Sequence, residues 1–474
     1  MHSNTLSQMN SRHNNCTLQL HSSPHKNAVM NKIGTFLTLF LSLCILACTK
    51  DKPEELNLDP ETEVLVNILQ DELQPLDKDP LSWRDQDLRW LDPMATKSII
   101  ALGESTHGTA EFFDAKHRIF KYLVENHGYR IFAIEADFGE SIYINEAIQE
   151  GRSDDIHDLM INKMHFWTWR TSEVKDLLEW MCSYNQGKAE DEKVHYMGVD
   201  CQFNTYHPAM AMDYLSRIDV PFLAFADSIL QVAEEASEGN FKNFSSGSFI
   251  SYLEGLEGLQ DSLIAHKDLL VAASSEKEFQ LHNRILELVS QVSEVKFYFQ
   301  LQQTTINYRD KYMAENASWL LDYFEGEKIV LWAHNGHIAN MEYGVTGSMG
   351  NYLSYQLREQ YVTLGFLFSQ GTFTAYGKKG DNYTGLGIQT LDSIPRENSL
   401  NALMSYTQEP AFFIDLDVLR NYLAWYNVFE EGIEYFQMGS SYNNRPGDYY
   451  SGFDPDYFHY MIYFDRSTAS DLLK

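Results

Sequence analysis

The chain has 474 residues, of which 44% are hydrophobic and 14% aromatic, which is enough for a sizeable core and excludes a disordered chain. Its formal net charge is −31. A polyanion binds the phosphate backbone of nucleic acids poorly, so we expect no nucleic-acid partner.

A targeting segment is predicted at the N-terminus. Lys32 precedes an apolar run that has the length of a signal-peptide core and is short for a membrane-spanning helix. The run ends in ILAC, which resembles the lipobox of bacterial lipoproteins, where the peptidase cuts before a cysteine that becomes lipidated. We expect an upstream extension at residues 1–29, a lipoprotein signal peptide at 30–47 and lipidation of Cys48. The alternative is a buried helix that contains a cysteine by chance.

The segment after the signal has the character of a tether. Residues 48–80 are charged, contain proline and show weak periodicity, apart from one amphipathic stretch at 64–73. We expect the folded domain at residues 81–474. Removal of the signal leaves Cys182 and Cys201, and one pair of cysteines in a large domain is no disulfide framework.

Ionisable side chains follow the carboxyl ends of several short apolar segments that have the length of buried strands. The segments are 98–102, followed by Glu104 and His107; 130–134, followed by Glu135; 195–199, followed by Asp200; and 329–333, followed by His334 and His337. In open α/β sheets, ligands bind outside the carboxyl ends of parallel strands. These side chains therefore predict an active site.

The order of the predicted elements indicates an α/β fold. A helical pattern that begins near Ala110 links the first two strands and stops at Gly128, a residue that can take the left-handed cap, so these elements form a βαβ unit. Residues 205–325 show helical periodicity without strands. Strand character returns at 361–368, 371–376, 410–414 and 457–464. We predict a mainly parallel sheet flanked by helices, with a helical insertion at 205–325.

Six sequence blocks resemble the erythromycin esterase family. They are GESTHGTAEFF at 103–113, EAD at 135–137, HFWTWRTSEV at 165–174, GVDCQ at 198–202, RDKYMAENASWLL at 309–321 and WAHNGHI at 332–338. The resemblance implies the wider α/β fold of those esterases and a hydrolase activity in which water opens a macrolide lactone, an activity of antibiotic resistance.

The resemblance also implies roles for single residues. The catalytic histidine of the family falls on His107, its supporting glutamates fall on Glu104 and Glu135, and its second histidine site falls on His334 and His337. A basic residue on the helix after the first motif falls at Lys116 or Arg118, and we expect it to contact the substrate.

The chemistry of ester hydrolysis favours the same side chains. The reaction requires a base for the attacking water, a donor or cation at the developing oxyanion and an acid for the leaving alkoxide. Imidazole suits the first task near neutral pH, and a neighbouring carboxylate fixes its tautomer, so we expect His107 to act as the base with Glu104 or Glu135 orienting it. His334 and His337 are expected to donate to the oxyanion or to the leaving group.

Substrate contacts are expected from Trp167, Arg170 and Arg309. The aromatic block at 165–169 fits the wall of a cleft for a large apolar lactone equally as well as packing of a helix on the sheet. The two arginines are equally consistent with structural ion pairs.

Two other mechanisms remain open. A serine nucleophile requires a G-x-S-x-G elbow, and His107 stands where the second glycine belongs, so Ser105 is a weak candidate. A divalent metal is the stronger alternative, because Glu104, His107, Glu135, His334 and His337 are ligand types for zinc or manganese. No H-E-x-x-H signature supports it, and we predict no cofactor. Asp200 and Cys201 are candidates for a supporting layer or for the core.

The sequence thus predicts a carboxylic ester hydrolase that acts on a small-molecule ester and is lipid-anchored in the cell envelope, on a periplasmic or outer-membrane face. One alternative is a metal-dependent hydrolase of the same fold with another envelope substrate. The other is a catalytically silent binding protein.

Overall fold

The computed structural model describes residues 56–474 except positions 240, 302–305, 345, 381 and 395. The expected extension, the signal peptide and Cys48 lie outside the described residues. No helix in the described part of the chain combines the length and the apolar character that crossing a membrane requires.

One sheet organises the fold, and ten strands of the described chain belong to it. Its main path runs β1 (Gln74–Pro75), β10 (Ala411–Asp415), β14 (Tyr460–Ser467), β8 (Tyr361–Lys379), β2 (Ile99–Leu102), β5 (Ile329–Trp332), β3 (Ile131–Asp137) and β4 (His195–Asp200), while β9 (Asn382–Leu391) and β12 (Ser441–Tyr442) pair with β8. All neighbours from β14 to β4 are parallel, and β1, β9 and β10 pair antiparallel. The predicted α/β class with a mainly parallel sheet is confirmed.

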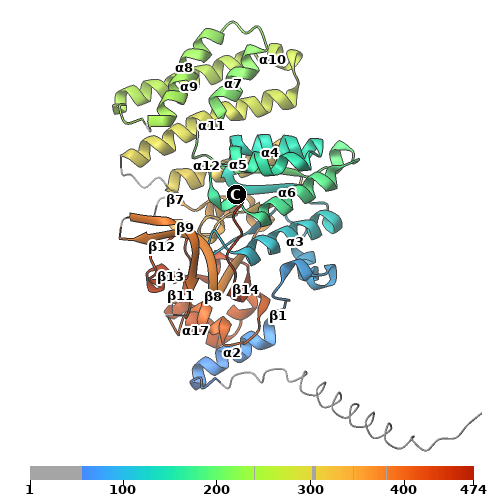
Figure 1. Cartoon of the computed structure of the whole chain (residues 1–474), viewed down its shortest axis with the longest axis vertical. Coiled ribbons are helices and arrows are strands. Elements are labelled where there is room, and N and C mark those ends of the chain that lie inside the picture. The colour runs from blue at the N-terminus through green and yellow to red at the C-terminus, as the bar shows by residue number, and fades with distance from the viewer. Residues whose placement is uncertain (1–55, 240, 302–305, 345, 381, 395) are drawn as a thin grey trace, which may run out of the picture. The chain divides into compact units, whose positions relative to one another are not determined.

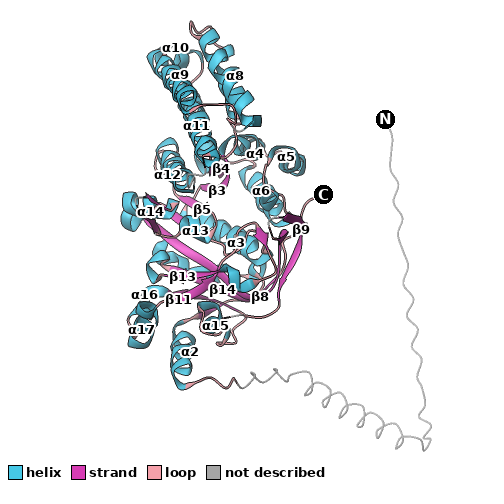
Figure 2. Cartoon of the chain, turned by 90° about the vertical axis from the view of Figure 1, so that its left-hand side faces the viewer, coloured by secondary structure: helices cyan, strands magenta, loops and turns pink. Residues whose placement is uncertain are grey.

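Helices cover both faces of the sheet (Figures 1 and 2). On β2, Ile100 and Leu102 belong to the core beneath α3 and α6, whereas Ile99 and Ala101 belong to the core beneath α12 and α14. Side chains alternate between faces along a strand, so a continuous apolar run is required where both faces are buried. These helices span Ala110–His127 (α3), Ser172–Asn185 (α6), Ile306–Tyr323 (α12) and Met349–Leu357 (α14).

The remaining elements complete these layers. The helices are α4 (Phe138–Glu150), α5 (Ile156–Lys163), α13 (Asn335–Ile338), α15 (Leu400–Ser405), α16 (Leu416–Arg420) and α17 (Leu423–Glu431). Two small antiparallel pairs join β6 (Glu342–Tyr343) to β7 (Thr346–Gly347), and β11 (Ile433–Phe436) to β13 (Tyr450–Phe453). Helix α3 ends at Gly128 with φ 71°, the left-handed cap that the sequence indicates.

Between β4 and β5 the described chain is helical, in the range expected for the insertion. It comprises α7 (His207–Ser216), α8 (Leu223–Gly239), α9 (Ser246–Ala265), α10 (Lys267–Ala273), α11 (Glu276–Gln300) and α12. Helices α7 to α11 pack on one another around a hydrophobic core of their own. Within the described part of this insertion, α12 and part of α11 contribute to the core beneath the sheet.

Two expected boundaries differ in the structure. The folded body begins before residue 81, because helix α2 (Pro60–Glu72) buries Leu65 and Leu69 in the core and accepts a hydrogen bond from the Trp425 indole at the Leu65 carbonyl. The two strands expected at 361–368 and 371–376 are one strand, β8. It passes through Gly371, whose φ of 125° suits only glycine and brings its backbone against that of Ser467.

Candidate active site

The loop after β2 is held closely against its neighbours. A Cβ at Gly103 would lie 2.0 Å from Oδ1 of Asn335, and one at Gly108 would lie 2.0 Å from the Thr374 carbonyl oxygen. Only glycine permits these approaches. The Asn335 N–H donates to the Glu104 carbonyl (2.8 Å), which ties the loop after β5 to the loop after β2. Two of the expected strand ends therefore meet.

His107 and Glu104 form a dyad in this loop. Nδ1 of His107 lies 2.7 Å from Oε1 of Glu104, whose other oxygen accepts from the Trp332 indole at 2.6 Å. Glu104 is fully buried, whereas His107 lines a pocket. Since a carboxylate can only accept, we assign the Nδ1 hydrogen to this bond. The lone pair of Nε2 is then left for a group in the pocket.

Lys116 lies beneath this dyad and away from the pocket. Its ammonium is 3.4 Å from Oε2 of Glu104 and 4.6 Å from the ring centroids of Trp332 and Phe366. Burial lowers the pKa of Lys116 to about 8, against the opposing effect of Glu104. A fully buried side chain cannot touch a substrate. The substrate contact expected at Lys116 is therefore corrected to support of Glu104.

Arg118 also lies outside the pocket. Its guanidinium donates to the Trp83 carbonyl (2.6 Å) and to Asp85 (2.5 Å), where α3 meets the segment that precedes β2. The expected substrate contact of Arg118 is corrected as well. Position on the helix alone did not distinguish the face of α3 that supports Glu104 from the face that binds this segment.

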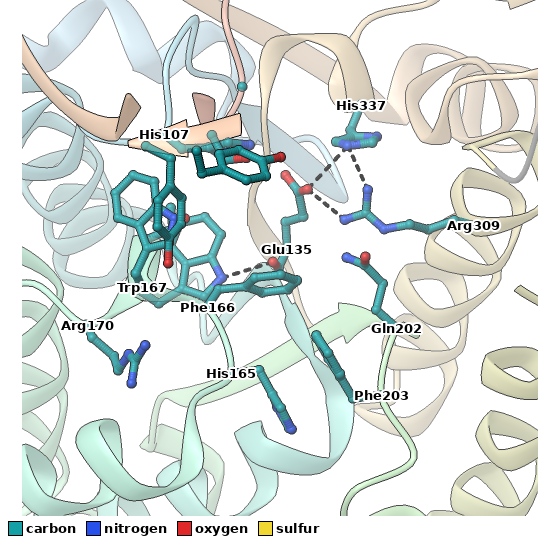
Figure 3. A pocket seen from close by; sticks show the side chains of 16 residues that line it. His107, Glu135, His165, Phe166, Trp167, Arg170, Gln202, Phe203, Arg309 and His337 are labelled. Carbon is teal, nitrogen blue, oxygen red and sulfur yellow. Dashed lines mark hydrogen bonds and ion pairs between the residues drawn. The ribbon is translucent and has the colours of Figure 1, made fainter. Parts of the chain in front are cut away.

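A second group of charges surrounds Glu135, at the end of β3 (Figure 3). Arg309, from α12, donates to both oxygens of Asp200 (2.8 and 2.7 Å) and to Oε1 of Glu135 (2.7 Å). The other oxygen of Glu135 accepts from the His334 backbone N–H at 2.9 Å. Arg309 and Glu135 both line the pocket, so the ion pair and the substrate contact that the sequence left open for Arg309 are compatible.

His337 completes this group as a cation. Its Nδ1 lies 2.5 Å from Asp310, and its Nε2 lies 3.2 Å from Glu135 and 3.1 Å from Nη1 of Arg309. Burial acts to lower the pKa of His337, but Asp310 and Glu135 outweigh it and raise the pKa to about 10. An imidazolium carries hydrogens on both nitrogens, so we assign the Nε2 hydrogen to Glu135 rather than to a bond with Arg309.

The electrostatics of Glu135 and His334 follow from the same contacts. Burial acts to raise the pKa of Glu135, but His337 and Arg309 hold it well below its ordinary value. Burial and the neighbouring His107 and His337 lower the pKa of His334 to about 3. Its ring centroid lies 5.0 Å from that of His107, but it does not line the pocket. The two histidines expected to act alike therefore differ in charge.

The pocket has a volume of about 770 Å³ and largely aromatic walls (Figure 3). Trp167 lines it as expected, and so does Arg170. Trp167 meets Tyr376 edge-on at 6.2 Å between ring centroids, and Tyr376 meets Tyr383 at 5.6 Å. The lining side chains are His107, Glu135, His165, Phe166, Trp167, Thr168, Trp169, Arg170, Gln202, Phe203, Arg309, His337, Tyr376, Tyr383 and Ser440, together with Gly439.

Several functional candidates escaped the sequence analysis. Asp310 follows Arg309 in the block at 309–321. An acidic side chain beside Arg309 was the signal that could have indicated it. Tyr376 and Tyr383 come from the β8–β9 hairpin, whose second strand the sequence did not indicate. Of the two candidates for a supporting layer or for the core, Asp200 supports the site through its contact with Arg309. Cys201 is buried in the core.

The alternatives also have a place in the structure. Ser105 is fully buried and does not line the pocket. Among the described residues, no three His, Cys, Asp or Glu side chains are arranged to hold a metal ion. Glu104 faces His107 and Glu135 faces Arg309 and His337, so these two carboxylates are turned towards separate partners.

Comparisons with known proteins agree with the sequence blocks. The model of the erythromycin esterase family matches residues 124–467. The chain is 26% identical over 373 residues to a putative hydrolase of Bacillus subtilis, YbfO, covering 72% of this chain and 79% of that protein. It is 25% identical over 332 residues to erythromycin esterase type II of Escherichia coli, covering 65% and 78%.

Solved structures share the fold. A Bacillus cereus protein matches with a TM-score of 0.75 at 22% identity, over 87% of this chain and 99% of its own. A mutant erythromycin esterase in its open conformation matches with a TM-score of 0.61 at 17% identity, over 85% and 99%.

Proposed function

The chain belongs to the erythromycin esterase family, and we propose that it is a hydrolase that opens a carboxylic ester or a lactone with water activated by His107. The observation that carries this proposal is the His107–Glu104 dyad, with one ring nitrogen bonded and the other left for the pocket. Opposite it stands a cationic pair, Arg309 and His337, which holds Glu135.

His107 moves the proton in this mechanism. Nε2 takes a proton from water while the water oxygen attacks the carbonyl carbon, and Glu104 stabilises the imidazolium through Nδ1–H. The bond between the carbonyl carbon and the alkoxy oxygen then breaks, and His107 returns the proton to the leaving oxygen. The products are an acid and an alcohol, or a hydroxy acid from a lactone.

The Arg309–His337 pair answers the charge that develops on the carbonyl oxygen. Both side chains line the pocket. Asp200 holds Arg309 and Asp310 holds His337 before any substrate arrives. Cations that are already oriented stabilise an oxyanion without reorganisation during the reaction. His334, which is neutral and is not among the residues that line the pocket, positions Glu135 through its backbone N–H.

The walls favour a bulky substrate. The volume of about 770 Å³ lies in the upper part of the range for ligand sites, and aromatic side chains line most of it. Macrolide lactones, the substrates that the family name indicates, satisfy both requirements, as do other large ring-bearing esters.

Incubation with a panel of macrolides and ring-bearing esters tests the proposal. We expect a product heavier by one water, seen by mass spectrometry, with the wild-type protein and not with His107→Ala. A panel left intact by well-folded wild-type protein, or cleaved equally by His107→Ala, would refute it.

We also propose that Cys48 anchors the protein to a membrane of the cell envelope by a lipid. The proposal rests on the ILAC sequence and the apolar run before it. Metabolic labelling with a fatty acid should mark the wild-type protein and not Cys48→Ala. Equal labelling of the two proteins would overturn the anchor.

A further inference from the structure

Arg170 differs from the other arginine of the pocket by having no acidic partner. Its backbone is fixed, since its N–H donates to the Trp167 carbonyl (3.0 Å) and its carbonyl accepts from Leu473 (2.9 Å). The side chain lines the pocket, and Figure 3 shows it on the wall below Trp167 with no bond to another residue drawn. Within the described part of the chain, no hydrogen bond or ion pair engages its guanidinium. Arg309, by contrast, bonds two carboxylates.

This lack of a partner is unexpected in so acidic a chain, which has 67 acidic and 36 basic side chains. No acidic side chain of the described residues forms an ion pair with the guanidinium of Arg170. Burial raises the pKa of Glu140 to about 8 and raises that of Asp137 well above its ordinary value. One oxygen of Glu140 accepts from the backbone N–H of His165 (2.7 Å) and contacts its Nδ1 (2.6 Å). Glu140 is therefore engaged by His165 rather than by the guanidinium of Arg170.

A second cation lies on the same side of the pocket. The ammonium of Lys296 is 5.8 Å from the ring centroid of Phe203, which stacks on His165 at 4.1 Å, and both rings line the pocket. Two basic side chains, Arg170 and Lys296, thus lie near these rings, although the chain as a whole is a polyanion.

We propose that Arg170 binds a carboxylate of the substrate, so that the pocket selects an ester that also carries a carboxylate. The proposal rests on the hydrolase function proposed above and names its substrate class. A guanidinium presents two parallel N–H groups that match a carboxylate, and such bonds are strongest where water is partly excluded. A cationic group at this wall would be repelled. An acidic substrate therefore fits the site better than a basic one.

Binding of uncleavable ligands tests this selection without requiring turnover. The probes are monobenzylamides of succinic, adipic and suberic acid, which vary the spacing, and the primary carboxamides of the same compounds, which lack the charge and contain no ester bond. Isothermal titration should show that the best acid binds wild-type protein about tenfold or more tightly than its carboxamide. This ratio should fall to about one in Arg170→Gln.

Lys378→Gln is the matched control, because it removes the same charge beside Tyr383, another residue that lines the pocket. The ratio should persist in this variant. Arg170→Lys keeps the charge but loses the two parallel N–H groups of the guanidinium, so the ratio should fall to an intermediate value. This variant replaces Arg170→Gln in the test if Arg170→Gln does not fold.

The proposal is overturned if no acid binds wild-type protein, if acids and carboxamides bind equally, or if the ratio survives in Arg170→Gln. An equal loss in Lys378→Gln would also overturn it, since a general charge effect would then explain the ratio. Failure of the hydrolase proposal is seen separately, in the assay of ester cleavage with His107→Ala.

Discussion

The two sides of the pocket use histidine in opposite ways. His107 has one nitrogen bonded to a single carboxylate, and its other nitrogen is left for the pocket. His337 contacts Asp310 through one nitrogen and Glu135 through the other, and these acids raise its pKa to about 10. The first arrangement allows a proton to move, whereas the second fixes a charge. The number of carboxylate partners, rather than the residue type, therefore distinguishes a candidate base from a candidate electrostatic support.

Removal of His107, the proposed base, gives the largest expected effect. We expect His107→Ala to lose roughly 10²–10⁴-fold in kcat, the usual worth of general acid–base assistance, while its melting temperature changes little. Ser105→Ala, the control, should retain substantial activity, because the hydroxyl is buried away from the pocket. An inactive Ser105→Ala together with an active His107→Ala would reverse the comparison.

Removal of one charge from the network around His337 should lower the free energy of unfolding. Asp310→Asn leaves His337 without its strongest partner in a buried network, so urea unfolding at pH 7 should show a loss on the order of 3 kcal/mol. Asp85→Asn breaks the pair with Arg118, in which the Asp85 carboxylate is exposed, and should cost less than about 1 kcal/mol. Equal losses in the two variants would contradict the distinction between the network and a surface pair.

The pH dependence of that loss has a definite sign. The pKa of His337 is raised from its ordinary 6.5 to about 10 in the folded protein, so the stability that it contributes is complete below pH 6.5 and is lost as the pH rises to about 10. The gap in unfolding free energy between wild type and Asp310→Asn should therefore shrink over this range. A gap that widens with rising pH would show that His337 is not the titrating group.

Removal of metal should have the smallest effect. Because the proposed mechanism moves its proton through His107 and balances the oxyanion with Arg309 and His337, we expect activity to survive exhaustive chelation. Activity that vanishes with a stoichiometric metal and returns on its addition would instead support the metal-dependent alternative.

The sequence indicated which side chains follow the strands, because these patterns are local. Short apolar strands followed by Glu104, Glu135 and His334 are visible as patterns, and the parallel sheet places their ends together. The sequence did not indicate which face of a helix contacts the site. Lys116 and Arg118 are two positions apart on α3, yet Lys116 contacts Glu104 and Arg118 contacts Asp85. The β8–β9 hairpin was missed because glycine and polar residues on β9 hide the strand pattern, so its tyrosines were not expected in the pocket.

By itself, the sequence determined the fold class, the family and the side chains that follow the strands, because each depends on residues close together in the chain. Only the tertiary structure decided the charge of each group. Arg309 and Glu135 are separated by 174 positions in the chain and are in contact. The contacts of Glu135 and Asp310 with His337 make it a cation against the opposing effect of Arg309. Burial, which likewise depends on the whole fold, makes His334 neutral. The fold also places Arg170 on the pocket wall without an ion pair among the described residues. Protonation follows from distance and desolvation, and neither can be derived from spacing along the chain.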